Sequence, residues 1–331
     1  MSNSASAAAV APSTSSSVSK AQTAYQSLSS IIPSIPAPSQ NPAFSLLHDS
    51  EISSQVSAYL RQPDSGAGDD NLCRWLYDTF QTTDPDLQLV VIRFLPIVAG
   101  VYLCRVTLRK PLAGFEAVLL ALYAHETASR AGNSLTVNVP DLSHPSVYHE
   151  SKAPAKNNAT DLNLAVISPS LEPHGTVRST RRPRIVSVAL ELYYSKIWQM
   201  PAASKIEFCE FCEAWAGQDG EIYSEGENGD RTKEEKEKEK AGKEGRVPLP
   251  WELLQPVLRI LGHCLMGTKK NEELFEAASS ACRSLYARSL HDINPNAILA
   301  TGSLLRLSKL AVIAEKEIDH TEIAMNTVIS L

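Results

Sequence analysis

The 331-residue sequence lacks the features that would place it in a disulfide-rich secreted class or a membrane class. Its six cysteines are scattered over residues 73–282, which excludes the dense framework of a small secreted domain and favours a reducing, intracellular location. The most apolar run, residues 87–104, is interrupted by Gln88, Arg93 and Pro96 and barely reaches membrane-spanning length. We therefore expect no transmembrane segment, and instead a buried core helix that is kinked at the proline.

Charge is almost absent from the N-terminal region. Residues 1–43 are mostly Ser, Ala, Pro and Thr, and Lys20 is the only charged residue before Asp49. Such a stretch cannot bury enough apolar surface to offset its ordering entropy, so we expect a disordered tail. It lacks the charged start and apolar block of a secretory signal, and Ser2 stands where N-myristoylation requires glycine. An organelle transit peptide is the alternative, although such peptides carry arginines and this stretch has none.

The composition of the whole chain is that of a globular protein. Apolar residues make up 43% and charged residues 21%, and the length allows one or two domains with a sizeable core. The net charge of −6 at pH 7 argues against a whole-molecule nucleic-acid binder.

Beyond residue 43, nearly every strong apolar pattern has the helical period, which predicts an all-α helical-hairpin bundle in a single domain over residues 44–316. Asp84 and Pro85 place an acidic cap and a proline where a helix start prefers them. The other expected helices cover 44–60, 71–80, 112–132, 185–200, 202–216, 250–266, 271–290 and 296–315. Only residues 135–139 alternate like a strand, and they either pair with residues 162–167 in one short β-hairpin or form an extended loop.

Two polar insertions interrupt the helical pattern, at residues 151–184 and 217–247, and we expect both to be flexible. The second is a run of glutamate and lysine without an apolar face that could dock on a core. Residues 317–331 form a C-terminal tail. The first insertion ends in a basic cluster, which is a candidate contact for anionic lipid or simply a solvated loop: Arg178, Arg181, Arg182 and Arg184.

Several stretches imitate catalytic or metal-binding motifs, and each lacks a required part. Cys209 and Cys212 form a C-x-x-C, but no second pair completes a zinc site and no βαβ context supports a redox dithiol, so we expect core thiols. The stretch GHCLMGTKK at 262–270 places its threonine before the lysine, unlike a phosphate-binding loop. His125-Glu126 begins like a metalloprotease helix, yet Ser129 occupies the position of the second histidine.

A fourth imitation is the string VPDLSHPSVYHE at residues 139–150. His144 and His149 beside Glu150 suggest a metal or acid–base site, but Pro145 restricts the backbone and no further ligand is identifiable. Catalytic serine and kinase signatures are absent as well. We therefore expect a binding protein rather than an enzyme, with no catalytic residues, no cofactor and no metal.

Three stretches of the chain together resemble the hyccin family. They are RFLPIVAGVYL (93–103), GFEAVLLALYAHE followed by SLTVNVPDLSHPSVYHES (114–151), and PLPWELLQPVLRILGHCLMGTKKNEELFEAASSACRSLYARSLHDINPNAIL (248–299). The most specific element is the Leu-Ser-x-Pro-Ser-Val-Tyr-His-Glu string in the second stretch. The resemblance spans about residues 44 to 315, nearly the entire expected folded region.

The resemblance implies an all-helical, non-catalytic subunit of the plasma-membrane phosphatidylinositol 4-kinase type III alpha complex. In that family the hyccin-type protein packs against a tetratricopeptide-repeat scaffold, and a lipid-anchored peripheral membrane protein attaches the assembly to the membrane. The chain is then expected in the cytoplasm, recruited to the inner face of the plasma membrane, where it supports phosphatidylinositol 4-phosphate synthesis. The alternative function is a helical adaptor that contacts anionic membrane directly through the basic loop, without a kinase.

The chain departs from the animal members of the family at its ends and in one insertion. It carries the acid-free N-terminal tail and the charged insertion at 217–247, and it ends soon after the last expected helix. These departures indicate a plant-type branch.

The motif match does not identify the surface that contacts a partner. An obligate helical interface uses an apolar face that the monomer cannot bury, and aromatic side chains are enriched there. Two apolar helices supply candidates, with burial in the internal core as the alternative for each: Phe94, Leu95, Tyr193, Tyr194, Ile197 and Trp198.

The string at 139–150 is predicted to be a structural loop that packs onto the helices or onto a partner. Its two prolines restrict the turn, while its large apolar side chains can fix it in place. The residues expected to do this are Pro140, Leu142, Pro145, Val147 and Tyr148, with His144 and His149 as hydrogen-bonding loop residues.

Overall fold

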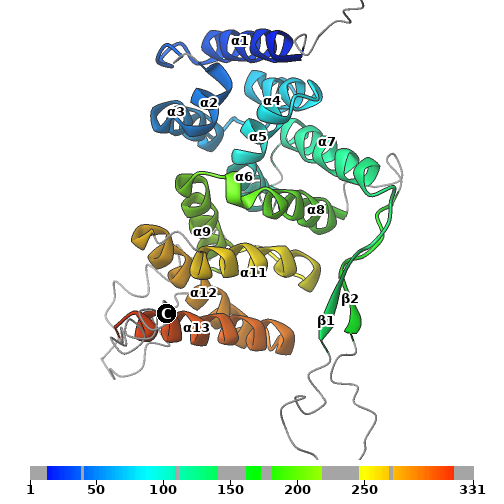
Figure 1. The fold of residues 1–331 in the computed structure, drawn as a ribbon, viewed down its shortest axis with the longest axis vertical. Helices are drawn as coiled ribbons and strands as arrows, with labels where there is room; N and C mark the ends of the chain where they lie inside the picture. The colour runs from blue at the N-terminus through cyan, green and yellow to red at the C-terminus, as the bar shows by residue number, and fades with distance from the viewer. Residues whose placement is uncertain are drawn as a thin grey trace, which may run out of the picture.

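The computed structural model describes residues 13–38, 41–106, 108, 110, 112–140, 162–172, 181–217, 246–267 and 271–316. Within these residues the chain is built of helices and one two-stranded antiparallel sheet. The helices stack from α1 at one end of an elongated body to α13 at the other, and the β-hairpin extends along one side (Figure 1). The expected all-α class is confirmed, and of the two alternatives for residues 135–167 the hairpin is the one formed.

The first half of the body consists of α1 (Ser13–Ile31), α2 (Pro42–His48), α3 (Ser50–Arg61), α4 (Asn71–Gln81), α5 (Pro85–Arg93), α6 (Leu95–Val106) and α7 (Ala113–Ser129). The hairpin strands follow as β1 (Leu135–Pro140) and β2 (Leu162–Ser168). The second half consists of α8 (Arg182–Ser195), the short 3-10 turn η2 (Ile197–Gln199), α9 (Ala202–Ala216), α11 (Trp251–Met266), α12 (Glu272–His291) and α13 (Pro295–Lys316).

Three of the early helices have an aspartate as their N-cap. The sequence predicts one of these caps, Asp84. The Asp84 carboxylate accepts hydrogen bonds from the backbone N–H groups of Asp86 (3.1 Å) and Leu87 (3.3 Å), with Pro85 in the first turn of α5. Asp49 and Asp70 cap α3 and α4 in the same way. Each cap satisfies backbone donors that have no partner within the helix.

The apolar run at 87–104 forms two helices instead of the single kinked helix that the sequence predicts. α5 and α6 meet at Phe94 with a bend of 41°. Pro96 has no N–H to offer the carbonyl one turn earlier, so the helix breaks two residues before the proline. Every residue from Leu95 to Leu103 is buried, which places the pair in the centre of the body. Among the described helices none is by itself long and apolar enough to cross a membrane, and only this bent pair reaches that length together.

Helix α1 corrects the expectation of a disordered tail over residues 1–43 in its second part, from Ser13 onward. A stripe at helical spacing packs onto the body, and its largest members are Tyr25, Leu28 and Ile32. The Trp75 indole N–H of α4 also donates to the Ala24 carbonyl at 2.9 Å. The average composition hides this stripe because hydroxyl residues surround it, while residues 1–12 lie outside the described residues.

The first polar insertion also contains structure. Residues 162–168 form β2, whose register with β1 runs from Leu135 opposite Ser168 to Pro140 opposite Leu162. Residues 169–172 continue onto the helical body, where Leu171 is buried. The expected flexibility of 151–184 therefore does not apply to this part. Residues 151–161 and 173–180, and the C-terminal tail at 317–331, lie outside the described residues.

Arg288 of α12 holds together the two ends of the charged insertion. Its guanidinium donates to the carbonyls of Trp215 (3.3 Å) and Ala216 (3.0 Å) before the insertion and of Val247 (3.1 Å) after it. The Val247 N–H also donates to the Trp215 carbonyl at 3.2 Å. Residues 218–245 lie outside the described residues. Because both ends are fixed on the core, the packing of the helices does not require a particular sequence between them.

We predict that replacing residues 218–245 by a Gly-Ser linker of a quarter of the length leaves the protein folded and slightly more stable. Two halvings of a loop reduce its closure entropy by about 1 kcal/mol in total. Urea unfolding monitored by tryptophan fluorescence measures the free energy of unfolding. Arg288→Ala is the contrasting variant, and we expect it to lose more than about 2 kcal/mol because it leaves buried carbonyls without donors. A shortened loop that destabilises as much as Arg288→Ala would contradict this account.

Candidate interaction surfaces

The β-hairpin is fixed to the helices at its base. The Leu171 N–H donates to the Gly132 carbonyl at 2.9 Å, and the Glu172 N–H donates to the Tyr123 hydroxyl at 3.1 Å. Ser168, the last residue of β2, is fully buried. From this base the two strands run along one side of the stack (Figure 1). The hairpin is thus an arm held at one end.

The arm beyond its base is apolar and uncharged. No Asp, Glu, Lys or Arg occurs in residues 134–140 or 162–171. The register places Val137 opposite Ala165 and Asn138 opposite Leu164, so aliphatic side chains project from both faces of the sheet. Five of them are exposed: Leu135, Val137, Val139, Leu164 and Val166.

The family-resemblance string lies between the two strands. Pro140 is the last residue of β1, paired with Leu162. The remaining members of the predicted structural loop lie outside the described residues, as do the two histidines and the glutamate beside them: Leu142, Pro145, Val147, Tyr148, His144, His149 and Glu150. Their structural role therefore stays a prediction.

The structure removes most of the predicted partner-facing residues from the surface. Four of the six are buried within the chain: Phe94, Leu95, Tyr193 and Ile197. Tyr194 is partly covered by the Arg259 guanidinium, which lies 5.4 Å from the ring centroid. Trp198 in η2 is 74% exposed and alone among the six presents its side chain to solvent. Periodicity misleads here because α8 packs on several sides, and all residues from Ile185 to Tyr193 are buried.

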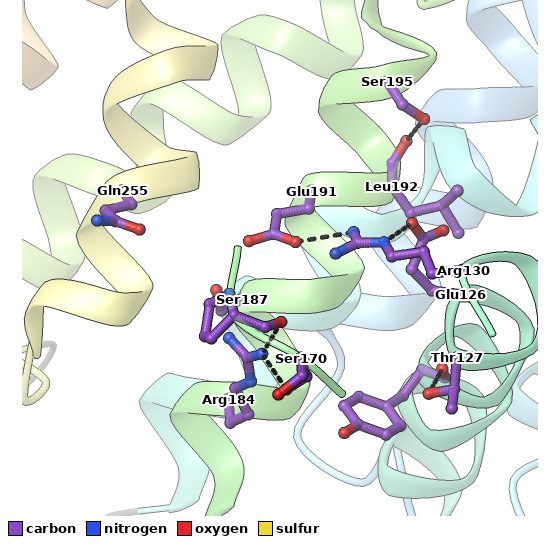
Figure 2. Close-up of polar contacts among 12 residues, drawn as sticks. Glu126, Thr127, Arg130, Ser170, Arg184, Ser187, Glu191, Leu192, Ser195 and Gln255 are labelled. Atoms are coloured by element: carbon purple, nitrogen blue, oxygen red, sulfur yellow. Dashed lines mark hydrogen bonds and ion pairs between the residues drawn. The ribbon is translucent and has the colours of Figure 1, made fainter. Parts of the chain in front are cut away.

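The basic cluster is largely occupied by internal contacts. Arg181 forms an ion pair with Glu172. The Arg182 guanidinium donates to the Tyr102 hydroxyl at 3.0 Å. Arg184 donates to the carbonyls of Pro169 (2.9 Å) and Ser170 (3.3 Å), the second of which Figure 2 shows. Arg178 lies outside the described residues. Three of the four arginines thus fix the start of α8 to its neighbours, which weakens the hypothesis of direct lipid contact.

Both thiols of the C-x-x-C lie in the core, as expected. Cys209 and Cys212 are fully buried. A hydrogen bond with Cys264 and burial raise the pKa of the Cys209 thiol, and burial raises the pKa of the Cys212 thiol. Both are therefore protonated and unreactive at neutral pH. Within the described part of the chain, no three His, Cys, Asp or Glu side chains are grouped to hold a metal ion.

A buried ionic network joins α7, α8 and α11. Arg130 of α7 contacts Glu126 one turn earlier at 2.5 Å and Glu191 of α8 at 2.9 Å (Figure 2). The other Glu191 oxygen lies 3.5 Å from the Arg259 guanidinium of α11. Two arginines and two glutamates balance in charge, so the network can be buried without a net charge.

The environment of this network affects its two arginines in opposite ways. Burial by itself lowers the pKa of Arg130, but its hydrogen bonds to Glu191 and Glu126 leave that pKa raised. Burial lowers the pKa of Arg259, and Glu191 only partly compensates. Glu191 is therefore the centre on which both cations depend. The network joins three helices through side-chain contacts.

We predict that Glu191→Ala lowers the free energy of unfolding by about 3–5 kcal/mol, because it leaves the largely buried Arg259 without a counter-charge. Arg130 loses one of its two carboxylates and keeps Glu126. Glu210→Ala is the matched control: it removes a glutamate whose ion pair with Arg61 is about half exposed. We expect that control to cost less than about 1 kcal/mol. Urea titration followed by circular dichroism measures both. Equal losses in the two variants would show that the network contributes no more than a surface ion pair.

One exposed apolar surface has no counterpart in the sequence-based prediction. Leu299, Leu307 and Leu310 of α13 are exposed on the last described helix. The small residues Ala297 and Thr301 occupy the buried side. The sequence does contain an indication of this surface. Leucines of α13 lie outside the stripe of small residues that faces the core.

The comparison with known families agrees with this architecture. A family model described as Hyccin matches residues 37–330, which includes α2 to α13 and the hairpin. The match covers the three stretches that carry the resemblance and most of the folded body. The chain belongs to the hyccin family.

Proposed function

We propose that this protein is a non-catalytic scaffold subunit that binds a tetratricopeptide-repeat partner and stabilises a phosphatidylinositol 4-kinase type III alpha complex at the plasma membrane. The observation that carries the proposal is the hyccin-family match over residues 37–330. A lipid-anchored peripheral protein would attach the complex to the membrane, so the chain would support phosphatidylinositol 4-phosphate synthesis without binding lipid itself. In this proposal the chain works in the cytoplasm, at the inner face of the plasma membrane.

The distribution of apolar side chains supports a binding role. The hairpin arm, Trp198 in η2 and the leucines of α13 expose large apolar groups in separate parts of the described body. Scattered apolar residues are normal on a surface, whereas an uncharged arm with aliphatics on both faces is unusual for a chain that works alone. A protein whose function is assembly is expected to carry such surfaces.

Co-expression tests the proposal directly. We predict that the chain produced alone is less soluble than its complex, and that co-expression with the tetratricopeptide-repeat subunit that copurifies with the kinase yields a soluble stoichiometric complex. A partner that binds only the folded state stabilises it by mass action, so the thermal midpoint of the chain should rise in the complex. Size-exclusion chromatography with light scattering gives the stoichiometry. A stable monomer that does not associate with this partner would contradict the proposed function.

Trp198 is the aromatic anchor that the structure leaves available. Exposed tryptophans that become buried in an interface are common binding hot spots and contribute about 2 kcal/mol or more. We predict that Trp198→Ala weakens the affinity for the tetratricopeptide-repeat partner about 30-fold without lowering the thermal midpoint of the free chain. Phe44→Ala, at an aromatic residue that is 58% exposed on α2, is the control. Unchanged affinity in Trp198→Ala would place the interface elsewhere.

A further inference from the structure

Helix α13 ends the stack with an apolar face that no described residue covers. Leu299 is 71%, Leu307 43% and Leu310 52% exposed. With Ser303 between them, these positions are spaced at three or four residues and lie on one side of the helix. The opposite side packs against α11 and α12 through small buried residues: Ala297, Thr301 and Ser308.

The other end of the stack has a different surface. The exposed side chains of α1 are mostly hydroxyls and amides: Ser19, Gln22, Thr23, Gln26, Ser27 and Ser30. Val18 is the exposed aliphatic residue of this helix, at 59%. Stacked-helix proteins need a polar outer face on their terminal elements. α1 meets this requirement and α13 does not, so the α13 face is expected to be covered in the assembled protein.

The turn that leads into α13 adds another exposed aliphatic side chain. Ile293 is 79% exposed and has a φ of 51°, in the left-handed region where a helix usually ends with glycine. A β-branched residue is uncommon there. The free chain gains no burial from this side chain, although the surrounding turn is well hydrogen-bonded, with the Asn294 N–H donating to the Ser289 carbonyl at 3.0 Å.

The charges beside the leucines are all of one sign. Arg306 and Lys309 are exposed next to them, and no Asp or Glu occurs from Pro295 to Leu310. An apolar stripe with a basic border complements an amphipathic helix whose apolar stripe has an acidic border. Of the surfaces that could cover α13, the charge pattern therefore favours one with an acidic border.

Two other occupants fit these charges less well. A twofold contact between copies of this chain would bring the same basic border from both sides, with no carboxylate from residues 295–310 to pair with Arg306 or Lys309. An anionic membrane would gain from the two cations, but helices that bind stably in the interface carry more basic residues and often aromatic ones. The described part of α13 has no aromatic residue.

We propose that the α13 face, defined by Leu299, Ser303, Arg306, Leu307 and Leu310, docks an amphipathic helix with an acidic border from the helical-repeat partner. The docked helix continues the stack across the interface and buries the leucines that the free chain exposes. The inference rests on the proposed function for the existence of that partner. It adds a second contact surface, apart from the one that contains Trp198, and the chemistry of the helix that contacts it.

The test measures the affinity of the full chain for the tetratricopeptide-repeat subunit by calorimetry. We expect Leu307→Asp/Leu310→Asp to weaken binding about 30-fold or more, because the complex would then bury two carboxylates in place of two leucines. Arg306→Glu/Lys309→Glu should weaken it about 10-fold at low salt and less at high salt. Val18→Asp alters an exposed aliphatic residue at the other end of the stack, and it should bind like the wild type. All these side chains are exposed, so the thermal midpoints of the free variants should agree.

The outcomes separate this inference from the proposed function. If both α13 variants bind with wild-type affinity, or if Val18→Asp loses as much affinity as they do, the inference is wrong. The proposed function is unaffected in either case. A wild-type chain that does not bind the partner overturns the proposed function and the inference together.

Two further measurements test the competing occupants. Faster amide hydrogen exchange in α13 after truncation at Lys316 would identify residues 317–331 as the cover and overturn the proposal. Binding of the wild type to phosphatidylserine vesicles that is lost in Leu307→Asp/Leu310→Asp would assign the face to the membrane instead. We expect unchanged exchange on truncation and no vesicle binding through this face.

Discussion

Burial of the bent helix pair α5–α6 is the constraint on which the rest of the body depends. The chain from Leu95 to Leu103 is buried on every side, and α3, α7, α8 and α9 all pack against α6. Burying a large aliphatic side chain contributes about 1.5–3 kcal/mol, so this segment is a major source of the folding free energy. The break at Phe94 lets the two helices point in different directions and contact different neighbours. A straight helix of the same composition would leave part of this apolar surface in water.

Buried arginines join the helices around this centre by donating to backbone carbonyls. Arg93 reaches the Leu47 carbonyl at the end of α2, and burial lowers its pKa to about 10. Arg105 donates to the carbonyls of Ser65 and Gln62 beyond the end of α3. Helix ends and turns leave carbonyls without partners, and a guanidinium carries five donors to satisfy them. The ends of α2 and α3 can therefore be buried in the stack without leaving these carbonyls unsatisfied.

The positions of most helices could be predicted from the sequence. The faces that remain exposed could not. Apolar spacing is a local property, so it locates α9 and α12 well. It fails for α1, because the stripe of Tyr25, Leu28 and Ile32 is diluted by serines in the average composition. It also fails for Tyr193, whose hydroxyl bonds to Ser204 in the interior at 3.1 Å, because aromatic residues suit cores and interfaces equally. Exposure depends on which elements pack on which, and a single helix does not contain that information.

The same limit explains why the exposed apolar face of α13 is visible only in the folded chain. A leucine at 299 or 310 has the same helical spacing whether a neighbouring helix covers it or not. The difference arises because α13 is the last described helix of the stack and already packs on α11 and α12 through its small residues. Small residues allow close approach on one side and leave the leucines for the other side. One face of α13 thus holds the fold together while the other presents an apolar surface, which is the arrangement that the proposed docking of a partner helix requires.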